Sequence, residues 1–248
     1  MKFRFLCLPL LPLLALALPA CNQQPSEDTA ATPPPPPPVP GPDLMALADS
    51  NAARLLLAYG RQYPGHEVLL QTRLGNMRIR LYDDTPIHTA NFLLLARKGV
   101  FDESVFNRVV KGLVVQGGGS ERRTIALHSY RLPPEIRPGH FHKRGALAMA
   151  RYDGEMNPDR LSSNNDFYIV QGEKMPPAQA RANAGRPLTP DQVQTYATLG
   201  GVPGLDGQYT VFGEVVEGLD VIDKIANEPV GTDNWPTTDV DIKVKVLR

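Results

Sequence analysis

Arg108 and Gln116 lie in a largely apolar stretch that runs from Val105 to Gly119. Two valine-rich runs flank Lys111-Gly112, a pattern that predicts a tight β-hairpin ending in a glycine-rich loop. The period-two alternation of a strand places Arg108 on the same face as Phe106. An arginine keeps its positive charge at any ordinary pH, so Arg108 would act as a fixed hydrogen-bond donor and not as a proton shuttle.

This stretch resembles the cyclophilin family of peptidyl-prolyl cis/trans isomerases, whose pattern is Phe-His-Arg, a hydrophobic pair, Pro-Gly-Phe-Met, one residue and Gln-Gly-Gly. Further blocks match in order, so the resemblance covers roughly Val68 to Leu247. It implies a mainly β fold, a closed eight-stranded antiparallel barrel capped by two helices, to which this chain adds N-terminal and inserted helices. The alternative is an ordinary hairpin with a surface arginine. The hairpin residues that match in register are Phe106, Arg108, Gly112, Gln116, Gly117 and Gly118.

The resemblance also implies the chemistry. An X-Pro amide has a rotation barrier of about 18–20 kcal/mol, and it isomerises when the amide twists, without a nucleophile, metal or cofactor. The twisted proline nitrogen gains a lone pair, and a guanidinium aimed at it stabilises the twisted state more than the planar one. Arg108 is the matched catalytic candidate, while Gln116 would hold the substrate backbone and steady Arg108. We expect no cofactor, no metal ion, and proline-containing polypeptides as partners.

The other groove residues follow only from the resemblance, because each apolar side chain taken singly would be assigned to the barrel core. The chain departs from the family at several places: Leu113-Val114 replace Phe-Met, and Asp166 replaces Gln. Asn107 and Tyr209 stand where the family has His, and Gly204 stands where many members have a Trp that contacts the inhibitor cyclosporin. Asp166 could pair with Arg108 or Arg151. These departures keep open a second hypothesis, a module that binds proline segments with weak or no turnover. The expected substrate-binding residues are Phe106, Leu113, Val114, Ala150, Arg151, Asp166, Phe167, Tyr168, Leu205 and Tyr209.

Residues 1–20 are typical of an export signal, with a basic start and an apolar run before Cys21. The four residues that end at Cys21 resemble a bacterial lipobox, in which the cysteine is diacylated; a cleaved signal with an incidental cysteine is the alternative. Residues 21–42 include the run Pro33 to Pro38 and predict an extended tether. Asn22 follows the cysteine, and by resemblance to enterobacterial sorting we expect a lipid-anchored, periplasm-facing protein of the outer membrane.

Asp43 can cap a helix that runs to about Tyr63. We interpret residues 43–65 as a docking or spacer element, because the cyclophilin core does not need this helix. Residues 66–248 then form the isomerase domain, with a helical insertion at about 173–201. The formal net charge of +0 implies no polyanion partner, so we expect no nucleic acid. We also expect a monomer.

Local signals predict the elements of the barrel. Within the insertion, Thr189-Pro190 predicts a helix start. The other expected elements are strands at 66–73 and 76–83 around a Gly75-Asn76 turn, a helix that starts at Thr85-Pro86 with Thr85 as its cap and ends at Gly99, strands at 145–151 and 162–170, a second capping helix at 219–225 and a closing strand at 240–247.

Two other kinds of site are weaker hypotheses. His140 and His142 alternate on one strand face and could bind a metal, but no cysteine or carboxylate stands at an obvious ligand spacing. Ser162-Ser163 lacks a nucleophile elbow, and spacing alone assigns it no histidine or acidic partner.

Overall fold

Eight strands close into an antiparallel barrel in the computed structural model, which describes residues 39–119, 123–152 and 154–247. Around the barrel the order is β1-β10-β3-β4-β8-β6-β9-β2, which confirms the expected barrel. A separate two-stranded pair joins β5 (Arg131–Leu132) to β7 (Ser162–Ser163). The barrel strands are β1 (Glu67–Thr72), β2 (Gly75–Leu81), β3 (Ser104–Val110), β4 (Val114–Gly117), β6 (Ala146–Met149), β8 (Phe167–Val170), β9 (Val211–Glu217) and β10 (Asp241–Val246).

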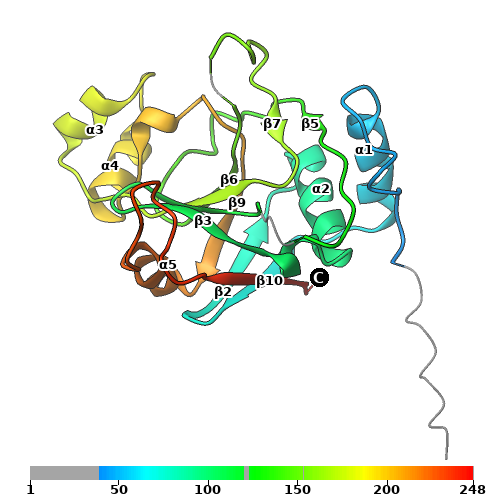
Figure 1. The fold of residues 1–248 in the computed structure, drawn as a ribbon. Helices are drawn as coiled ribbons and strands as arrows, with labels where there is room; N and C mark the ends of the chain where they lie inside the picture. The colour runs from blue at the N-terminus through cyan, green and yellow to red at the C-terminus, as the bar shows by residue number, and fades with distance from the viewer. Residues whose placement is uncertain (1–38, 120–122, 153, 248) are drawn as a thin grey trace, which may run out of the picture. The chain divides into compact units, whose positions relative to one another are not determined.

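Helices cover the barrel on opposite sides. In Figure 1, α1 and α2 lie side by side on one side, whereas α3 and α4 lie on the other and α5 lies near β2. The expected capping helices are both present, as α2 and α5. The helices are α1 (Ala52–Gln62), α2 (Pro86–Arg97), α3 (Pro177–Asn183), α4 (Pro190–Thr198) and α5 (Leu219–Ala226), with short 3-10 turns η1 (Val100–Glu103) and η2 (Pro203–Leu205).

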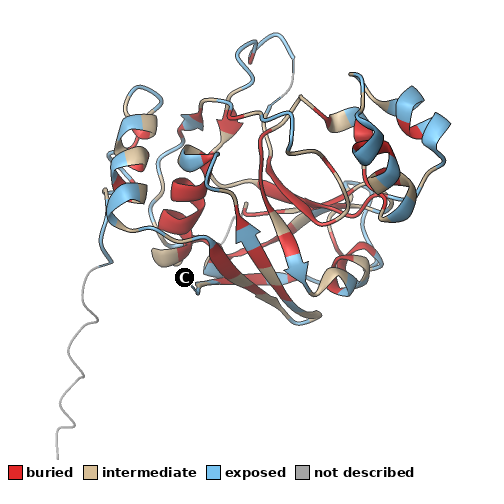
Figure 2. Ribbon diagram, turned by 180° about the vertical axis from the view of Figure 1, so that it is seen from behind, coloured by how far each residue is buried: buried red, intermediate tan, exposed pale blue. Residues whose placement is uncertain are grey.

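The barrel core is closed by α2, which is buried along most of its length (Figure 2). Phe92 of this helix packs edge-on against Phe167 of β8, with ring centroids 5.5 Å apart. Phe101 makes a second edge-on contact with Phe167 at 5.5 Å. Burial of several large aromatic side chains supplies much of the hydrophobic stabilisation of a domain of this size.

The N-terminal helix begins later than expected. Asp43 accepts a hydrogen bond from the backbone of Met45, and Asn51 accepts one from Ala48, so local turns occupy this stretch before α1 starts at Ala52. These side chains satisfy backbone groups in turns, which competes with helix formation.

The N-terminal helix, interpreted from the sequence as a docking or spacer element, packs against the folded domain. Leu47, Leu56 and Tyr59 belong to the same buried cluster as the barrel interior. Arg97 of α2 donates to the Tyr59 hydroxyl at 3.0 Å and to a backbone carbonyl just after α1. The pairing of α1 with α2 therefore extends the core beyond the barrel.

The first hairpin turns two residues earlier than the sequence suggested. Thr72 pairs with Gly75, so Arg73 and Leu74 form the turn and Gly75 is already in β2. The hydroxyl of Thr72 accepts a hydrogen bond from the Leu74 backbone and donates to the Gly75 carbonyl, which stabilises the turn at this position.

A glutamate far along the chain caps α2. Thr85, the expected cap, donates its hydroxyl to the Tyr82 carbonyl instead. The carboxylate of Glu135 accepts hydrogen bonds from the first free backbone N–H groups of the helix, those of Ile87 at 3.1 Å and His88 at 2.9 Å. A negative charge at a helix N-terminus is favourable. In contrast, Thr189 caps α4 as expected, through a reciprocal capping box with Gln192.

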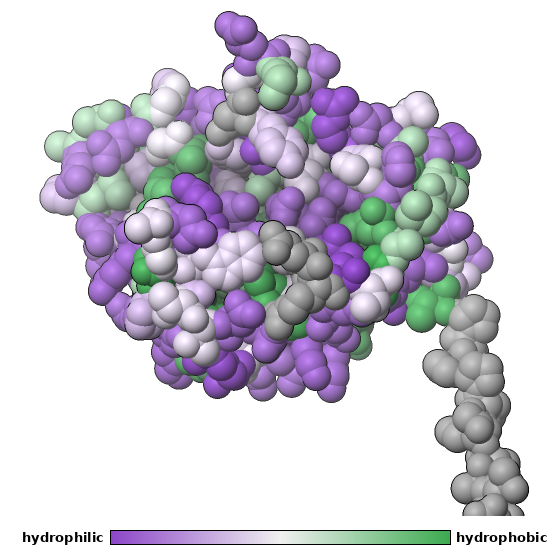
Figure 3. All heavy atoms as spheres, in the orientation of Figure 1, coloured by the Kyte–Doolittle hydropathy of each residue, from purple (hydrophilic) through white to green (hydrophobic). Residues whose placement is uncertain are grey.

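No helix in the described ranges, 39–119, 123–152 and 154–247, is long and apolar enough to cross a membrane. The face drawn in Figure 3 is mostly hydrophilic, with hydrophobic residues in separate patches.

We expect Glu135→Gln to destabilise the fold, because the amide cannot replace a buried carboxylate that receives three N–H groups, two from the backbone and one from the His88 ring. Loss of such charge-assisted hydrogen bonds costs about 1.5–3 kcal/mol of unfolding free energy. Thermal unfolding should show a Tm lower by about 2–4 °C for each kcal/mol lost.

Glu217→Gln is the matched control, since Glu217 is mostly exposed and pairs with Arg78. Its Tm should stay close to that of the wild type. Equal Tm values for the two variants would contradict the capping role of Glu135.

Candidate active site

A row of paired residues crosses the outer face of four neighbouring strands. Arg108 on β3 pairs with Gln116 on β4, Gln116 pairs with Tyr168 on β8, and Tyr168 pairs with Ala148 on β6. Directly paired residues on adjacent strands point to the same side of a sheet. The closed barrel thus brings the guanidinium, the amide and the phenol onto one surface.

A β-bulge in β3 makes this row possible. Phe106 pairs with Gly117 and Arg108 with the adjacent Gln116, so Asn107 is an extra residue on β3. Phe106 consequently points into the barrel, where it is fully buried, while Arg108 is exposed on the outside. The expectation that Phe106 and Arg108 share a face is therefore wrong, because strict alternation does not hold across a bulge.

Arg108, Gln116 and Tyr168 of this row line a groove of about 420 Å³. Its wall is formed by the outer barrel face, by the end of β6 and by the segment around η2. Every residue that lines it was expected from the sequence. The lining residues are Arg108, Leu113, Val114, Gln116, Ala150, Arg151, Tyr168, Leu205 and Tyr209.

Two expected groove residues, Phe106 and Phe167, lie elsewhere. Both are fully buried in the barrel interior, and their rings make an edge-on contact at 6.3 Å. Phe167 precedes Tyr168 on β8, and successive strand residues point to opposite faces. These phenylalanines therefore support the groove wall from inside and cannot contact a ligand in it.

Aromatic rings and a second cation form one side of the groove. Tyr168 and Tyr209 meet edge-on, with ring centroids 5.7 Å apart. The guanidinium of Arg151 lies over the Tyr209 ring, 4.7 Å from its centroid, a distance typical of a cation–π interaction. This side could hold a flat or cyclic apolar group against tyrosine faces.

The glycine run after β4 is required by close packing. Gly118 has φ of +106°, and a Cβ atom at this position would lie 2.0 Å from the Asn165 carbonyl oxygen. A Cβ at Gly117 would come within 2.7 Å of Ile242. A side chain at either position would push β4 away from its neighbours and disturb the row that carries Gln116.

Asp166 is close to the groove but does not line it. Its carboxylate accepts a hydrogen bond from the Ser163 hydroxyl at 3.0 Å. Burial raises the pKa of Asp166, and the Ser163 hydrogen bond and the charge of Arg123 oppose this shift. Asp166 thus interacts with Ser163 and Arg123, not with Arg108 or Arg151 as the sequence suggested.

Gly204, at the position where many cyclophilins have Trp, lies in a neighbouring cavity of about 360 Å³. A Cβ atom at Gly204 would lie 3.2 Å from the backbone oxygen of Asn183 at the end of α3. Helix α3 of the insertion therefore ends beside the rim of the groove. Leu113 lines both cavities.

The two histidines proposed as metal ligands have separate partners. His140 lies 2.7 Å from an Asp84 oxygen and stacks on Tyr82, whereas the buried His142 contacts Asp206 and Tyr168. The part of the chain that the structure describes contains no group of three or more histidine, cysteine or acidic residues that could hold a metal ion.

Sequence reasoning missed a serine–histidine–glutamate chain. His88 lies between the Glu135 carboxylate, 2.7 Å from Nδ1, and the Ser162 hydroxyl, 3.0 Å from Nε2. The order resembles that of a hydrolytic triad, yet all three side chains are buried and Glu135 caps α2. A nucleophile must be reached by its substrate, so this chain is structural. No sequence signal connects three residues so far apart.

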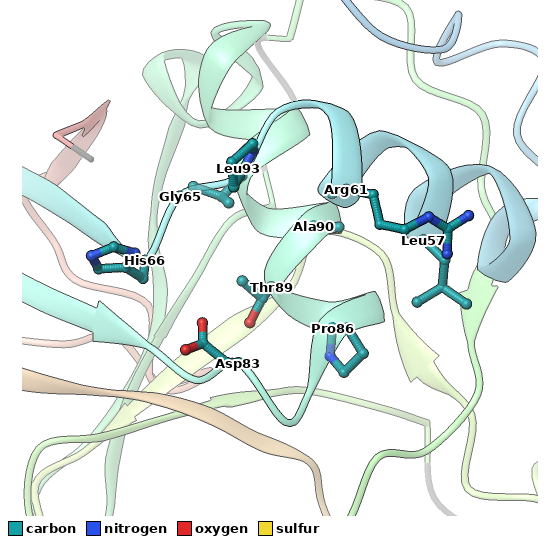
Figure 4. Close-up of a pocket in the computed structure, with 11 residues that line it drawn as sticks. Leu57, Arg61, Gly65, His66, Asp83, Pro86, Thr89, Ala90 and Leu93 are labelled. Atoms are coloured by element: carbon teal, nitrogen blue, oxygen red, sulfur yellow. The ribbon is translucent and has the colours of Figure 1, made fainter.

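A third cavity, of about 340 Å³, lies between α1 and α2 (Figure 4). Arg61 of α1, Thr89 of α2 and the loop residues His66 and Asp83 contribute its polar groups. None of the residues singled out by the family resemblance lines it. The candidate active site is therefore the groove around Arg108.

Comparison with known proteins gives one family. The model of the cyclophilin type peptidyl-prolyl cis-trans isomerase/CLD family matches residues 67–246, from the start of β1 to the end of β10. A Staphylococcus saprophyticus protein, provisionally named a peptidyl-prolyl cis-trans isomerase, is 32% identical over 184 residues, covering 72% of this chain and 90% of the relative.

A Streptococcus pyogenes protein, provisionally named a bifunctional phosphatase/peptidyl-prolyl cis-trans isomerase, is 33% identical over 187 residues. The match covers 73% of this chain but 38% of that relative. Among solved structures, a Cryptosporidium parvum cyclophilin type isomerase matches with a TM-score of 0.54 at 21% identity, covering 74% of this chain and 98% of that one. At this identity the structural match supports the fold alone.

The raised pKa of Asp166 predicts a pH-dependent stability. Because the folded state favours the protonated carboxyl, stability should fall as pH rises from the ordinary aspartate pKa through the raised one. Asp166→Asn stays neutral and can still accept the Ser163 hydrogen bond. We expect its Tm to exceed that of the wild type at pH 7, by about 2–4 °C for each kcal/mol recovered, and the difference to shrink toward pH 4.

Asp220→Asn is the control of opposite sign, since a side-chain hydrogen bond from Lys224 lowers the pKa of Asp220. Its Tm at pH 7 should not rise. A Tm of Asp166→Asn at or below the wild-type value at pH 7 would refute the burial argument.

Proposed function

The chain belongs to the cyclophilin-type peptidyl-prolyl cis-trans isomerase family, and on that premise we propose that it isomerises X-Pro bonds of cell-envelope proteins in the groove around Arg108. The observation that carries this proposal is the row Arg108–Gln116–Tyr168 on one barrel face. It combines a fixed cation, a hydrogen-bonding amide and an aromatic surface beside one another.

Arg108 supplies the electrostatic part of the reaction. As the X-Pro amide twists, it loses resonance and the proline nitrogen develops a lone pair that can accept a hydrogen bond. The guanidinium donates to that nitrogen in the twisted state, and therefore lowers the barrier more than it strengthens ground-state binding. Within the described ranges no carboxylate pairs with Arg108, so the cation is available to a substrate.

The rest of the groove holds the substrate. Gln116 is directly opposite Arg108 and can bind the peptide backbone. The pyrrolidine ring packs against Tyr168, Val114 and Leu113, which bury apolar area without forming bonds to the reacting amide. Orientation by these contacts keeps the proline nitrogen within reach of Arg108.

A solved relative indicates the substrate class. The Cryptosporidium parvum isomerase was also solved in the presence of the dipeptide Ala-Pro, with a TM-score of 0.53 to this chain. By analogy, we assign proline-containing polypeptides to the Arg108 groove. The chain acts on them as a monomer, since one barrel carries the whole groove.

A second candidate function is a module that binds proline segments with weak or no turnover. Leu113 and Val114 favour it, because they give the groove less aromatic area than the family pattern Phe-Met. Asp166 no longer favours it, since its carboxylate contacts Ser163 and, among the described residues, does not pair with Arg108.

The envelope location rests on residues 1–42, of which 1–38 lie outside the described residues. The export signal, Cys21 and the proline run support an outer-membrane lipoprotein that faces the periplasm. Uncatalysed X-Pro isomerisation takes tens of seconds or more, so an isomerase held at the membrane would accelerate the folding of exported chains.

We expect Arg108→Ala to remove most isomerase activity while the barrel stays folded. Because the guanidinium acts mainly in the twisted state, kcat should fall by about 10²-fold or more with a modest change in KM. The assay is isomerisation of an Ala-Pro peptide by protein that starts after Pro42.

Arg131→Ala is the control, since Arg131 is exposed and pairs with Asp49 away from the groove. Its kcat should equal that of the wild type. An unchanged kcat for folded Arg108→Ala would exclude Arg108 from the mechanism, whereas a wild type that binds the peptide without turnover would favour the binding module.

Cys21→Ala should move the protein from the membrane fraction to the soluble periplasm. Cys21 is the only cysteine that follows the export signal, so its loss removes the proposed acylation site. Fractionation and immunoblotting of both forms measure this. A soluble wild type, or a variant that remains in the membrane fraction, would contradict lipid anchoring.

A further inference from the structure

The hydroxyl of Tyr168 links the groove to a buried polar chain. It lies 2.9 Å from Nε2 of His142, and Nδ1 of the same ring lies 3.1 Å from a carboxylate oxygen of Asp206. His142 and Asp206 are almost completely buried. The hydroxyl of Tyr168 is thus bound by a histidine that is itself buried.

The carboxylate of Asp206 sets the direction of the hydrogen bonds that reach it. The Asp206 carboxylate can only accept, and it receives the backbone N–H of His142 at 2.8 Å and the hydroxyl of Tyr196 at 2.8 Å. Burial lowers the pKa of His142 against the opposing effect of Asp206, which favours the neutral imidazole. In that form Nδ1 carries the ring proton and donates to the Asp206 carboxylate, and Nε2 accepts from the Tyr168 hydroxyl.

The far end of the chain is in the inserted segment. Tyr196 belongs to α4, is fully buried and packs edge-on against Phe141 at 5.5 Å. The capping box at Thr189 fixes the start of this helix. An insertion that the eight-stranded barrel does not require for closure is therefore connected to the groove through Asp206, His142 and Tyr168.

We propose that His142 is a positioning residue of the isomerase, and that His142 and Tyr196 of the inserted helix hold the Tyr168 ring in the orientation that binds the substrate proline. This inference rests on the proposed function, since it assigns a role to residues behind the Arg108 groove. The structure brings the four groups into one hydrogen-bonded chain from α4 to β8.

A held ring matters because the groove has few rigid apolar surfaces. Leu113 and Val114 are aliphatic and have no flat face, so Tyr168 and Tyr209 provide the flat faces for a pyrrolidine ring. The proline contacts Tyr168 in the planar and in the twisted state alike. Loosening the ring should therefore raise KM and leave kcat nearly unchanged, the pattern of lost uniform binding.

Tyr196→Phe tests the chain with little change in packing. It removes only the hydroxyl that donates to Asp206, and we expect KM for an Ala-Pro peptide to rise about threefold to tenfold, the effect of one lost hydrogen bond. His142→Gln should raise KM at least as much. Unfolding midpoints measured on the same samples show whether each variant is folded.

Tyr130→Phe is the matched control. Tyr130 is as buried as Tyr196, and its hydroxyl donates to Asn91 of helix α2 at 2.7 Å. This variant also loses one buried hydrogen bond, so a general loss of stability would affect both proteins. We expect KM to change in Tyr196→Phe and to stay at the wild-type value in Tyr130→Phe.

A double-mutant cycle shows whether the effect passes through Tyr168. In Tyr168→Phe the chain no longer reaches the groove ring, so adding Tyr196→Phe should raise KM no further. An equal effect of Tyr196→Phe in both backgrounds would overturn the proposal. So would an unchanged KM in folded Tyr196→Phe, or an equal rise in Tyr130→Phe.

Failure of the proposed function has a different signature. A wild type without turnover would refute isomerisation, and calorimetric titration of the same variants with the Ala-Pro peptide would still test the chain. In that case the dissociation constant should rise for Tyr196→Phe and not for Tyr130→Phe. Equal constants for these two variants would overturn the positioning role.

Discussion

The groove depends on one irregularity, the β-bulge at Asn107 that turns Phe106 inward and Arg108 outward. With regular alternation both side chains would point the same way. Either an arginine would then enter the aromatic core, where an unpaired charge is very costly, or Phe106 would leave the core. The bulge satisfies both residues at the cost of one unpaired position, and it sets the register that aligns Arg108 with Gln116.

Two buried histidines, His88 and His142, make similar pairs of hydrogen bonds. Each has a carboxylate at Nδ1 and a hydroxyl at Nε2: Glu135 and Ser162 for His88, and Asp206 and Tyr168 for His142. Their roles differ because of where each chain ends. The chain of His88 ends on a buried serine and caps a helix, whereas the chain of His142 ends on a ring that lines the groove.

Sequence reasoning was reliable where the signal is local or carried by a family block. It named nine residues that line one groove, and it placed a helix start at Thr189, where the structure has a capping box. It was wrong where geometry depends on distant partners: a period-two pattern does not reveal a bulge, so Phe106 was misplaced. Thr85 was chosen as a cap although Glu135, some fifty residues later, takes that role. The N-terminal helix begins at Ala52 and not after Asp43, because side chains stabilise turns in the residues between them.

The departures from the family pattern are connected through the insertion. Replacing a Phe-Met pair by Leu113 and Val114 removes aromatic area from one wall and leaves two tyrosines, Tyr168 and Tyr209, as the flat surfaces of the groove. A phenol can be fixed through its hydroxyl in a way that a phenylalanine cannot, and His142 provides the acceptor. The same insertion places Asn183 beside Gly204, where the Cβ atom of a side chain would lie 3.2 Å from the Asn183 carbonyl oxygen. The groove therefore has less apolar surface at its rim, and hydrogen bonds hold the Tyr168 ring that remains. The barrel supplies this ring, and helix α4 of the insertion supplies part of the hydrogen-bonded chain behind it.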